Sequence, residues 1–413
     1  SVVNETSVPL RWSATENIAW TAPIVGYGQS SPVIWNDRVY VTSVEGPKKE
    51  TCRVSAFQLA DGKSVWSETV PSSFPVLSTE YVSRAAPTPA ADANGLFAFF
   101  ESGDLAAFSH DGKKLWGRCL GKDYGELQSN HGLAASPALT ASAVIVLVDH
   151  GGPSYLAAFG KADGKLVWKT DRTSRQSWSS PALIRVGDAE HLVVSSNGSV
   201  DGYDPADGAL LWTFTDVSGN TSCTPRALGD GMLVIGASGG REGRTANAAK
   251  SNMALRIVRK GDKFEAEAAW TAEDATSSFG SPVVHKGLVY FVNRFGVVYC
   301  LDAKTGEKKY AQRTKQSIWA TPVGIGDRVY LFGKDGTTTV LASGPEFSVL
   351  AENPLFGESE DAAEPEAEGT GRREGGRAAR GGPIQYGVAL VPGALLIRAG
   401  DKLYCVRDSS ASK

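Results

Sequence analysis

The chain has 413 residues with a formal net charge of −3, and 42% of the residues are hydrophobic. This apolar content excludes an intrinsically disordered protein, and the small net charge excludes the basic surface typical of nucleic-acid-binding proteins. No stretch approaches the roughly 18 apolar residues of a membrane-spanning helix. We therefore expect no transmembrane segment and no specific nucleic-acid partner.

Short runs of Val, Leu, Tyr and Phe alternate along the chain with clusters of Gly, Asp, Asn and Pro, a pattern typical of an all-β protein. The first recurring landmark is a Ser-Pro or Thr-Pro step shortly before an apolar strand. Proline suits the start of a strand, because its missing N–H removes no hydrogen bond from the sheet. The steps are Ser31-Pro32, Thr88-Pro89, Ser136-Pro137, Ser180-Pro181, Thr224-Pro225, Ser281-Pro282 and Thr321-Pro322.

The second landmark is a glycine-containing turn followed by a tryptophan, as in ADGKSVW, which ends at Trp66. Glycine tolerates the positive φ of a tight turn, and tryptophan is large enough to fill the wedge between neighbouring sheets. Tyr310 continues the series, and Leu350 is expected to be its last, degraded copy. The predicted structural tryptophans are Trp20, Trp66, Trp116, Trp168, Trp212 and Trp270.

The two ends of the chain complement each other. Residues 17–24 resemble an outermost strand with no inner strands before it, whereas residues 386–407 resemble three inner strands with no tryptophan strand after them. We therefore predict an eight-bladed β-propeller of four-stranded antiparallel blades, closed by the N-terminal strand joining the C-terminal blade. Seven blades is the alternative, because the copies at 225–270 and 322–350 are the most irregular. A single domain then spans residues 1–413.

Residues 357–383 depart from the repeat, with an acidic first half and an Arg/Gly-rich second half. Their near lack of apolar residues predicts a disordered loop inserted before the closing blade. A charge-balanced tether is favoured over a contact with nucleic acid or anionic lipid. The five cysteines are all separated in sequence, so we expect buried packing residues rather than a disulfide framework; Cys300 and Cys405 fall at matching points of two repeats.

The units CLDAKTGEKKY (300–310) and GYDPADGALLW (202–212) resemble the A-x-D-x-x-T-G-x-x-x-W repeat of pyrroloquinoline quinone (PQQ)-type propellers. The resemblance runs from Trp20 to Asp408. The opening segment resembles exported PQQ-like propellers of planctomycetes and related bacteria. The family includes quinoprotein alcohol dehydrogenases and BamB-like scaffolds of outer-membrane β-barrel assembly, so the repeat implies the fold and leaves the activity open.

Two functions follow from this resemblance. The first is a non-catalytic binding or scaffold propeller of the bacterial cell envelope that holds a protein or glycan partner at the channel mouth or blade edges. The alternative is a PQQ- and Ca²⁺-dependent quinoprotein oxidoreductase. Those dehydrogenases carry a vicinal cysteine pair and an acidic/Asn calcium set, and neither motif is recognisable here. We therefore predict no catalytic residues, no metal site and no cofactor, and favour the scaffold.

The resemblance also implies an exported protein. The chain begins at Ser1 without a methionine, which fits removal of a signal sequence. We expect a periplasmic or secreted monomer. A polysaccharide hydrolase or lyase would need paired carboxylates at one mouth, and the segments that lead there contain few.

The candidate binding residues precede the Ser/Thr-Pro steps. In a propeller these lead-in segments run from the outer strand of one blade to the inner strand of the next, so they converge around one mouth of the central channel. Aromatic side chains with Arg, Gln and His suit a ligand or peptide platform; the alternative is that they plug the channel or pack on the inner strands. The candidates are Gln29, Arg84, His131, Trp178, Phe279 and Trp319.

Overall fold

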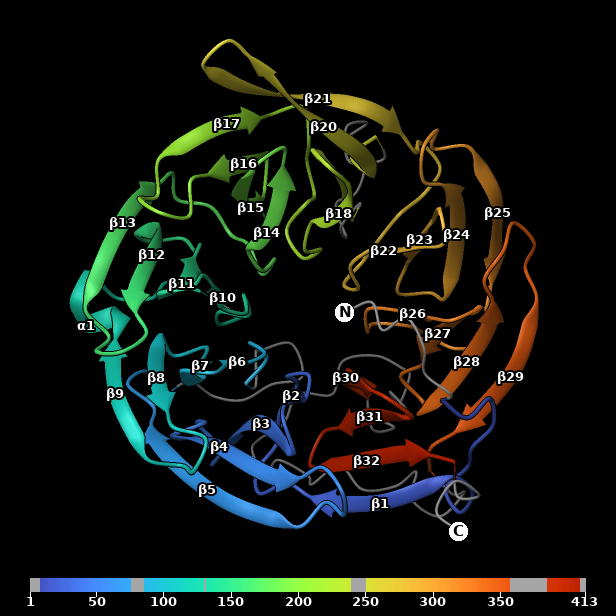
Figure 1. The fold of residues 1–413 in the computed structure, drawn as a ribbon, viewed down its shortest axis with the longest axis horizontal. Coiled ribbons are helices and arrows are strands. Elements are labelled where there is room, and N and C mark those ends of the chain that lie inside the picture. The colour runs from blue at the N-terminus through green and yellow to red at the C-terminus, as the bar shows by residue number, and fades with distance from the viewer. Residues whose placement is uncertain (1–7, 76–84, 130, 239–249, 357–384, 409–413) are drawn as a thin grey trace, which may run out of the picture.

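The computed structural model describes residues 8–75, 85–129, 131–238, 250–356 and 385–408, with only the backbone of residues 385 and 386. Its strands form eight four-stranded antiparallel sheets arranged in a ring (Figure 1). This confirms the predicted eight-bladed β-propeller and excludes the seven-bladed alternative. The helix in the described part, α1 (Leu120–Tyr124), follows the outer strand of the second blade. The described residues include no helix with the length and apolarity that crossing a bilayer demands.

Within blades 1 to 7 the strands are neighbours in chain order, from the innermost to the outermost. Blade 1 contains β2 (Val33–Trp35), β3 (Arg38–Glu45), β4 (Thr51–Gln58) and β5 (Ser64–Pro71). Blade 2 contains β6 (Ala90–Asp92), β7 (Gly95–Phe99), β8 (Asp104–Phe108) and β9 (Lys114–Cys119). Blade 3 contains β10 (Ala138–Leu139), β11 (Ala143–Val148), β12 (Ser154–Gly160) and β13 (Leu166–Arg172). Blade 4 contains β14 (Ala182–Val186), β15 (Ala189–Ser196), β16 (Ser199–Tyr203) and β17 (Leu210–Phe214).

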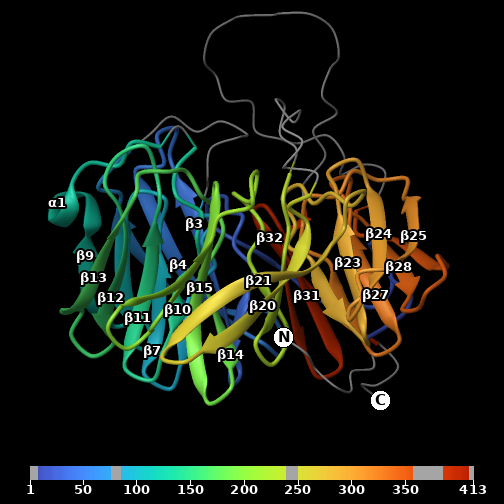
Figure 2. The ribbon, with the colours of Figure 1, turned by 90° about the horizontal axis from the view of Figure 1, so that it is seen from above.

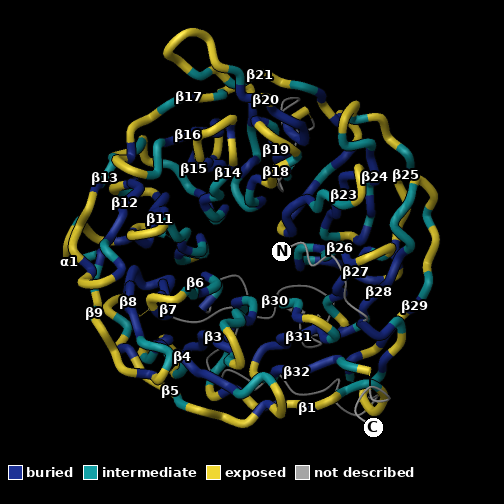
Figure 3. Tube along the Cα trace, in the orientation of Figure 1, coloured by how far each residue is buried: buried dark blue, intermediate teal, exposed yellow. Residues whose placement is uncertain are grey.

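The second half of the ring repeats the order. Blade 5 contains β18 (Arg226–Gly229), β19 (Met232–Ile235), β20 (Met253–Lys260) and β21 (Lys263–Thr271). Blade 6 contains β22 (Val283–His285), β23 (Leu288–Val292), β24 (Val297–Asp302) and β25 (Lys308–Arg313). Blade 7 contains β26 (Val323–Ile325), β27 (Arg328–Phe332), β28 (Thr337–Ala342) and β29 (Val349–Pro354). The buried residues group into clusters between neighbouring sheets, while the outer strands carry exposed residues at the rim (Figure 3).

Blade 8 is built from both ends of the chain. It contains β30 (Gln385–Val391), β31 (Ala394–Ala399), β32 (Lys402–Arg407) and, as its outermost strand, β1 (Ile18–Pro23). β1 pairs antiparallel with β32, and Trp20 lies opposite Cys405. The predicted closure is therefore confirmed. The segment 357–383 falls between β29 and β30 in sequence but lies outside the described residues.

The tryptophan repeat has a specific place in each blade. The outer strand contains a β-bulge directly before the tryptophan, which lies opposite a small residue of the third strand, as in the pairs Trp66–Ala56 and Trp212–Gly202. A Cβ on Gly202 would lie 2.1 Å from the Trp212 ring, so this position leaves no room for a side chain. Cys300 and Cys405 occupy this same small-residue position of the third strand. Each lies opposite the outer-strand aromatic residue of its blade.

The tryptophan also links its blade to the next one. The indole N–H of Trp66 donates to the His110 carbonyl at 2.9 Å, and that of Trp116 donates to the Lys161 carbonyl at 2.8 Å. Its ring lies against the turn glycine of that blade: a Cβ on Gly112 would approach Trp66 to 2.8 Å. The turn glycine therefore supplies both positive φ (94° at Gly112) and space for the ring.

The prediction that Leu350 is the last copy of this series is wrong by one residue. Val340 pairs with Ala351 and Leu341 pairs with Val349, which makes Leu350 the bulge residue and places Ala351 at the tryptophan position. The missing ring is supplied by the N-terminal segment. Trp12 stacks on Tyr330 at 6.2 Å between ring centroids, as Trp66 packs on Tyr40 at 5.9 Å in blade 1.

The Ser/Thr-Pro steps of blades 1 to 7 form an open ring of hydrogen bonds, which we call the hydroxyl ring. In blades 1 to 6 the backbone N–H of the Ser or Thr donates to the hydroxyl of its counterpart in the next blade, as from Thr88 to Ser136 at 3.0 Å and from Ser136 to Ser180 at 2.9 Å. Six such bonds join blades 1 to 7. By register, blade 8 has Gly387 at this position. A Cβ there would lie 2.4 Å from the Cα of Ser31, so the seam between blades 8 and 1 closes through backbone contact instead.

Candidate functional site

The lead-in segments lie on one face of the ring, which we call the lead-in face. They share it with the turns between the second and third strands of the blades: Tyr27 bridges to Val44, and Ile318 bridges to Gly333. This face is uppermost in Figure 2, where α1 begins the connection from blade 2 to blade 3. The lead-in segments and turns together therefore form the surface on which the predicted site residues lie.

Two of the predicted residues meet above blades 3 and 4. The rings of His131 and Trp178 are 5.7 Å apart and tilted by 58°. The indole N–H of Trp178 donates to the Gly132 carbonyl at 3.1 Å, which ties the two lead-in segments together. His131 is exposed and Trp178 is partly buried. The pair therefore presents a fixed aromatic edge to solvent.

Two further predicted residues meet above blades 6 and 7. The ring centroids of Phe279 and Trp319 are 4.7 Å apart, and the Lys334 ammonium lies 3.8 Å from the centroid of the Trp319 ring. Phe279 is 44% exposed, although it is a large apolar side chain. Lys334 comes from the turn between β27 and β28 and was not among the sequence-predicted residues.

The other two predicted residues stay apart from these pairs. Gln29 lies partly buried on the lead-in to blade 1, next to the buried Gly28 and Ser30. Arg84 lies outside the described residues. The structure thus groups four of the six predicted residues into two pairs, and whether any of them binds a partner stays a prediction.

A buried ionic network fixes the lead-in face near the first pair. The Arg172 guanidinium contacts Asp149 at 3.0 Å and Asp201 at 3.2 Å, and its side chain is 1% exposed. Burial opposes its charge, but the two carboxylates outweigh burial and raise the pKa of Arg172. Asp149 and Arg172 belong to blade 3 and Asp201 to blade 4, so the network joins the two blades. Asp149, Arg172 and Asp201 belong to no sequence motif, so the network could not be predicted from the sequence.

The features of a quinoprotein metal site were sought among the side chains that the structure describes. Within the described ranges no three side chains of His, Cys, Asp or Glu gather closely enough to hold a metal ion. All five cysteines carry free thiols, and none is adjacent to another. We therefore derive no reaction step through a quinone or a metal.

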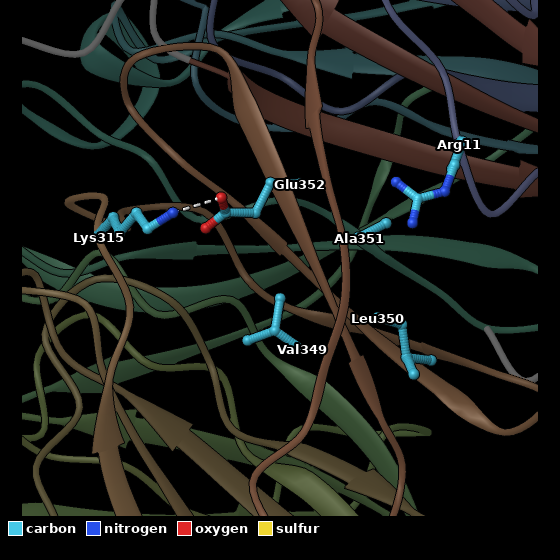
Figure 4. A pocket seen from close by; sticks show the side chains of 6 residues that line it. All are labelled: Arg11, Lys315, Val349, Leu350, Ala351 and Glu352. Atoms are coloured by element: carbon cyan, nitrogen blue, oxygen red, sulfur yellow. Dashed lines mark hydrogen bonds and ion pairs between the residues drawn. The ribbon is translucent and has the colours of Figure 1, made fainter.

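Two of the hollows in the described part of the structure lie along blade surfaces. One, of about 460 Å³, runs along β29 where Ala351 replaces the repeat tryptophan, and Lys315 pairs with Glu352 across it at 2.7 Å (Figure 4). The other, of about 350 Å³, lies between blades 1 and 2 and is lined by Trp35, Tyr40, Trp66 and His110, among others. Both are shallow features of the blade surfaces and contain none of the predicted site residues.

Comparison with known proteins places the chain in a family. The family model described as outer membrane protein assembly factor BamB matches residues 10–138, 110–260 and 256–344. The chain belongs to the BamB family. The outer membrane protein assembly factor BamB of Yersinia pestis is 25% identical over 304 residues, which cover 71% of each chain. BamB of Shewanella oneidensis is 24% identical over 371 residues, which cover 78% of this chain and 88% of the relative.

Solved structures agree on the fold. BamB from Moraxella catarrhalis superimposes with a TM-score of 0.62 at 15% identity, over 93% of this chain and 95% of that one. The quinohemoprotein alcohol dehydrogenase of Comamonas testosteroni superimposes with a TM-score of 0.59 at 11% identity, over 96% and 78%. At these identities the likeness shows the propeller alone. Membership in the BamB family supports a propeller that acts as a scaffold.

Proposed function

We propose that this protein is a non-catalytic scaffold of the bacterial cell envelope, located in the periplasm, that holds a protein partner on its lead-in face. The observation that carries the proposal is the pair of aromatic contacts, His131 with Trp178 and Phe279 with Trp319, held at the surface of that face. Partly exposed aromatic rings are characteristic of the centres of protein interfaces. The relatives are named outer membrane protein assembly factors, which favours a protein over a glycan as the partner.

Hydrogen bonds also tie the described segments of this surface together. The hydroxyl ring joins the lead-in segments directly before the inner strands, and Trp178 bonds across to the neighbouring segment. A platform that is ordered before the partner arrives loses little conformational entropy on binding. The lead-in face is therefore suited to hold a partner rather than to change shape around a substrate.

A crosslinking experiment in the source bacterium tests the proposal. A photoreactive amino acid replaces Phe279 in one strain and Leu115, which is 42% exposed on the outer strand β9, in a control strain. We expect the probe at 279 to capture one defined envelope protein that the probe at 115 does not capture. We also expect a Trp178→Ala/Trp319→Ala double variant to lose that partner in co-purification. The proposal is contradicted if only the probe at Leu115 captures a protein. It is also contradicted if the double variant co-purifies with the partner as well as the wild type does.

The likeness of the fold to quinohemoprotein alcohol dehydrogenases motivates one alternative, a PQQ-dependent oxidoreductase. Adding pyrroloquinoline quinone and Ca²⁺ to the purified protein tests it by absorption spectroscopy. The scaffold proposal predicts no saturable change in the quinone spectrum. A saturable signal that a chelator removes would instead support the oxidoreductase.

A further inference from the structure

An aromatic and positively charged surface lies on the lead-in face above blades 6 and 7. It includes two exposed phenylalanines, Phe279 at 44% and Phe295 at 54%. Only the first of these belongs to the predicted site. We call this surface the aromatic–cationic patch, and its residues are Phe279, Arg294, Phe295, Arg313, Trp319 and Lys334.

Contacts between the loops make the patch continuous. Arg294 and Phe295 lie in the turn between β23 and β24, where the N–H of Arg294 donates to the Ser278 hydroxyl at 3.0 Å. The Ser317 hydroxyl donates to the Arg294 carbonyl at 2.6 Å. The lead-ins that carry Phe279 and Trp319 are thus fixed to the turn that carries Phe295. The patch is one surface formed by two blades.

The cations of the patch are held over its rings. The Arg294 guanidinium lies 4.8 Å from the Phe295 ring centroid, and the Lys334 ammonium lies 3.8 Å from that of Trp319. Arg313 donates from Nε to the Phe295 carbonyl at 3.1 Å. Considering the described residues only, none of these three cations has a carboxylate within ion-pair distance. The nearby Asp335 accepts the N–H of Thr337 at 3.0 Å.

The pair of His131 and Trp178, above blades 3 and 4, has a different electrostatic setting. Arg175, on the lead-in that carries Trp178, lies 3.8 Å from Asp201, and that carboxylate also contacts Arg172. Positive charge is therefore neutralised near Trp178. Within the part of the chain that the structure describes, the cations beside exposed aromatic rings above blades 6 and 7 have no such carboxylate partner.

From this arrangement we propose that the aromatic–cationic patch binds an acidic peptide segment with apolar side chains, carried by the partner of the proposed scaffold. Carboxylates of the segment pair with Arg294, Arg313 and Lys334, while its apolar side chains cover Phe279 and Phe295. A single-stranded nucleic acid fits less well, because it needs open ring faces for base stacking. Cations cover one face of Trp319 and one of Phe295, and Phe279 packs on Trp319 at 47°.

The inference rests on the proposed function and is tested by calorimetric titration of the full chain. The probe is a synthetic decapeptide of glutamates with two phenylalanines, compared with a version that has glutamine for glutamate and with oligothymidylate. The variant is Arg294→Gln/Lys334→Gln. The matched control, Lys63→Gln/Lys165→Gln, removes the same charge from side chains that are 82% and 83% exposed in rim turns.

We expect the acidic peptide to bind the wild type and the control equally, and to bind the patch variant about tenfold more weakly. The glutamine peptide should bind weakly to all three proteins. Equal binding of the acidic peptide to patch variant and control overturns the inference, and so does tighter binding of oligothymidylate. If the peptide result is negative while the probe at 279 still captures its partner, the proposed function stands and the acidic-segment inference falls.

Discussion

At the scale of single residues, Trp12 completes a blade to which it does not belong in sequence. It is 2% exposed and packs on Tyr330, and its backbone N–H donates to the Asn353 side-chain oxygen at 3.2 Å. The Asn353 amide in turn donates to the Leu10 carbonyl at 3.0 Å. The N-terminal segment is therefore part of the core of blade 7, where Ala351 leaves room for it.

Replacing this ring should leave a cavity between blades 7 and 8. We expect Trp12→Ala to lower the free energy of unfolding by about 3 to 5 kcal/mol, because no neighbouring side chain can take the place of the indole. Trp12→Phe should cost clearly less. Urea unfolding measures both, with Val25→Ala as the control at a position that is 56% exposed. A loss for Trp12→Ala no larger than that of the control would contradict this account.

His191 makes stability depend on pH. It is buried, and its Nδ1 accepts the indole N–H of Trp212 at 3.1 Å, so the ring proton is on Nε2. Burial lowers the pKa of His191 below the ordinary value of 6.5. As pH falls through 6.5, the unfolded chain binds a proton that the folded chain does not, so acid favours unfolding.

We therefore expect His191→Asn to be less sensitive to acid than the wild type. Its side-chain oxygen can still accept the Trp212 bond but does not titrate. Thermal unfolding from pH 7.5 to 5.5 should bring the two proteins closer together in stability as the pH falls. Other groups, such as the buried His150 and Glu101, are common to both proteins and cancel in the difference. If the difference in stability between wild type and His191→Asn does not change with pH, His191 is not a source of the acid sensitivity.

At the scale of elements, the hairpin of β20 and β21 replaces a repeat turn. It extends beyond the ring in Figure 1. Its residues Ile257 and Phe264 join the cluster around Trp212, and the His191 ring lies edge-on to Phe264 at 4.5 Å. This explains why Trp212 bonds to a histidine of its own blade, whereas the other repeat tryptophans bond to a turn carbonyl of the next blade.

The strand β1 closes the ring, and its loss should open it. Removing residues 1–24 exposes the edge of β32 and also takes away Trp12. We expect this truncated chain to aggregate and to lose its cooperative melting transition. Size-exclusion chromatography and circular dichroism check this, with a chain lacking residues 1–7 as the control. A monomeric, cooperatively melting truncation would show that the latch is dispensable.

The sequence was sufficient to predict the blade count, the strand at each end and the six repeat tryptophans, because proline, glycine and tryptophan each mark a position that few residues can fill. The sequence was not sufficient to predict contacts between segments that are distant in sequence, such as Trp12 on Tyr330. Trp12 has no turn glycine before it, and Ala351 carries no signal. In the same way Trp178, Phe279 and Trp319 share a distance to their prolines, whereas Arg294 and Phe295 lie in a turn of ordinary composition.

At the scale of the whole molecule, the hydroxyl ring joins seven blades and stops at Gly387. Ser136 accepts the N–H of Thr88, and this N–H loses its partner if the hydroxyl is removed. No such bond from blade 8 to the Ser31 hydroxyl is found among the described residues. The Ser136 hydroxyl therefore joins two blades, whereas, in the part of the chain that the structure describes, the Ser31 hydroxyl does not.

This difference provides a matched pair of variants. We expect Ser136→Ala to lower the free energy of unfolding by about 1 kcal/mol, because the partly buried N–H of Thr88 is left without an acceptor. Ser31→Ala, at the seam, should change it by less than about 0.5 kcal/mol. Chemical unfolding measures both. Equal losses would mean that the hydroxyls stabilise their own lead-in segments and not the ring.

The composite blade has a consequence for synthesis. Among the described strands, β1 leaves the ribosome before all the others, and its partner β32 leaves after them. Throughout translation the growing chain is an open arc of blades whose two flanks cannot yet meet. A chain interrupted before β30 lacks the inner strands of blade 8, so the ring can close only after β32 has been made.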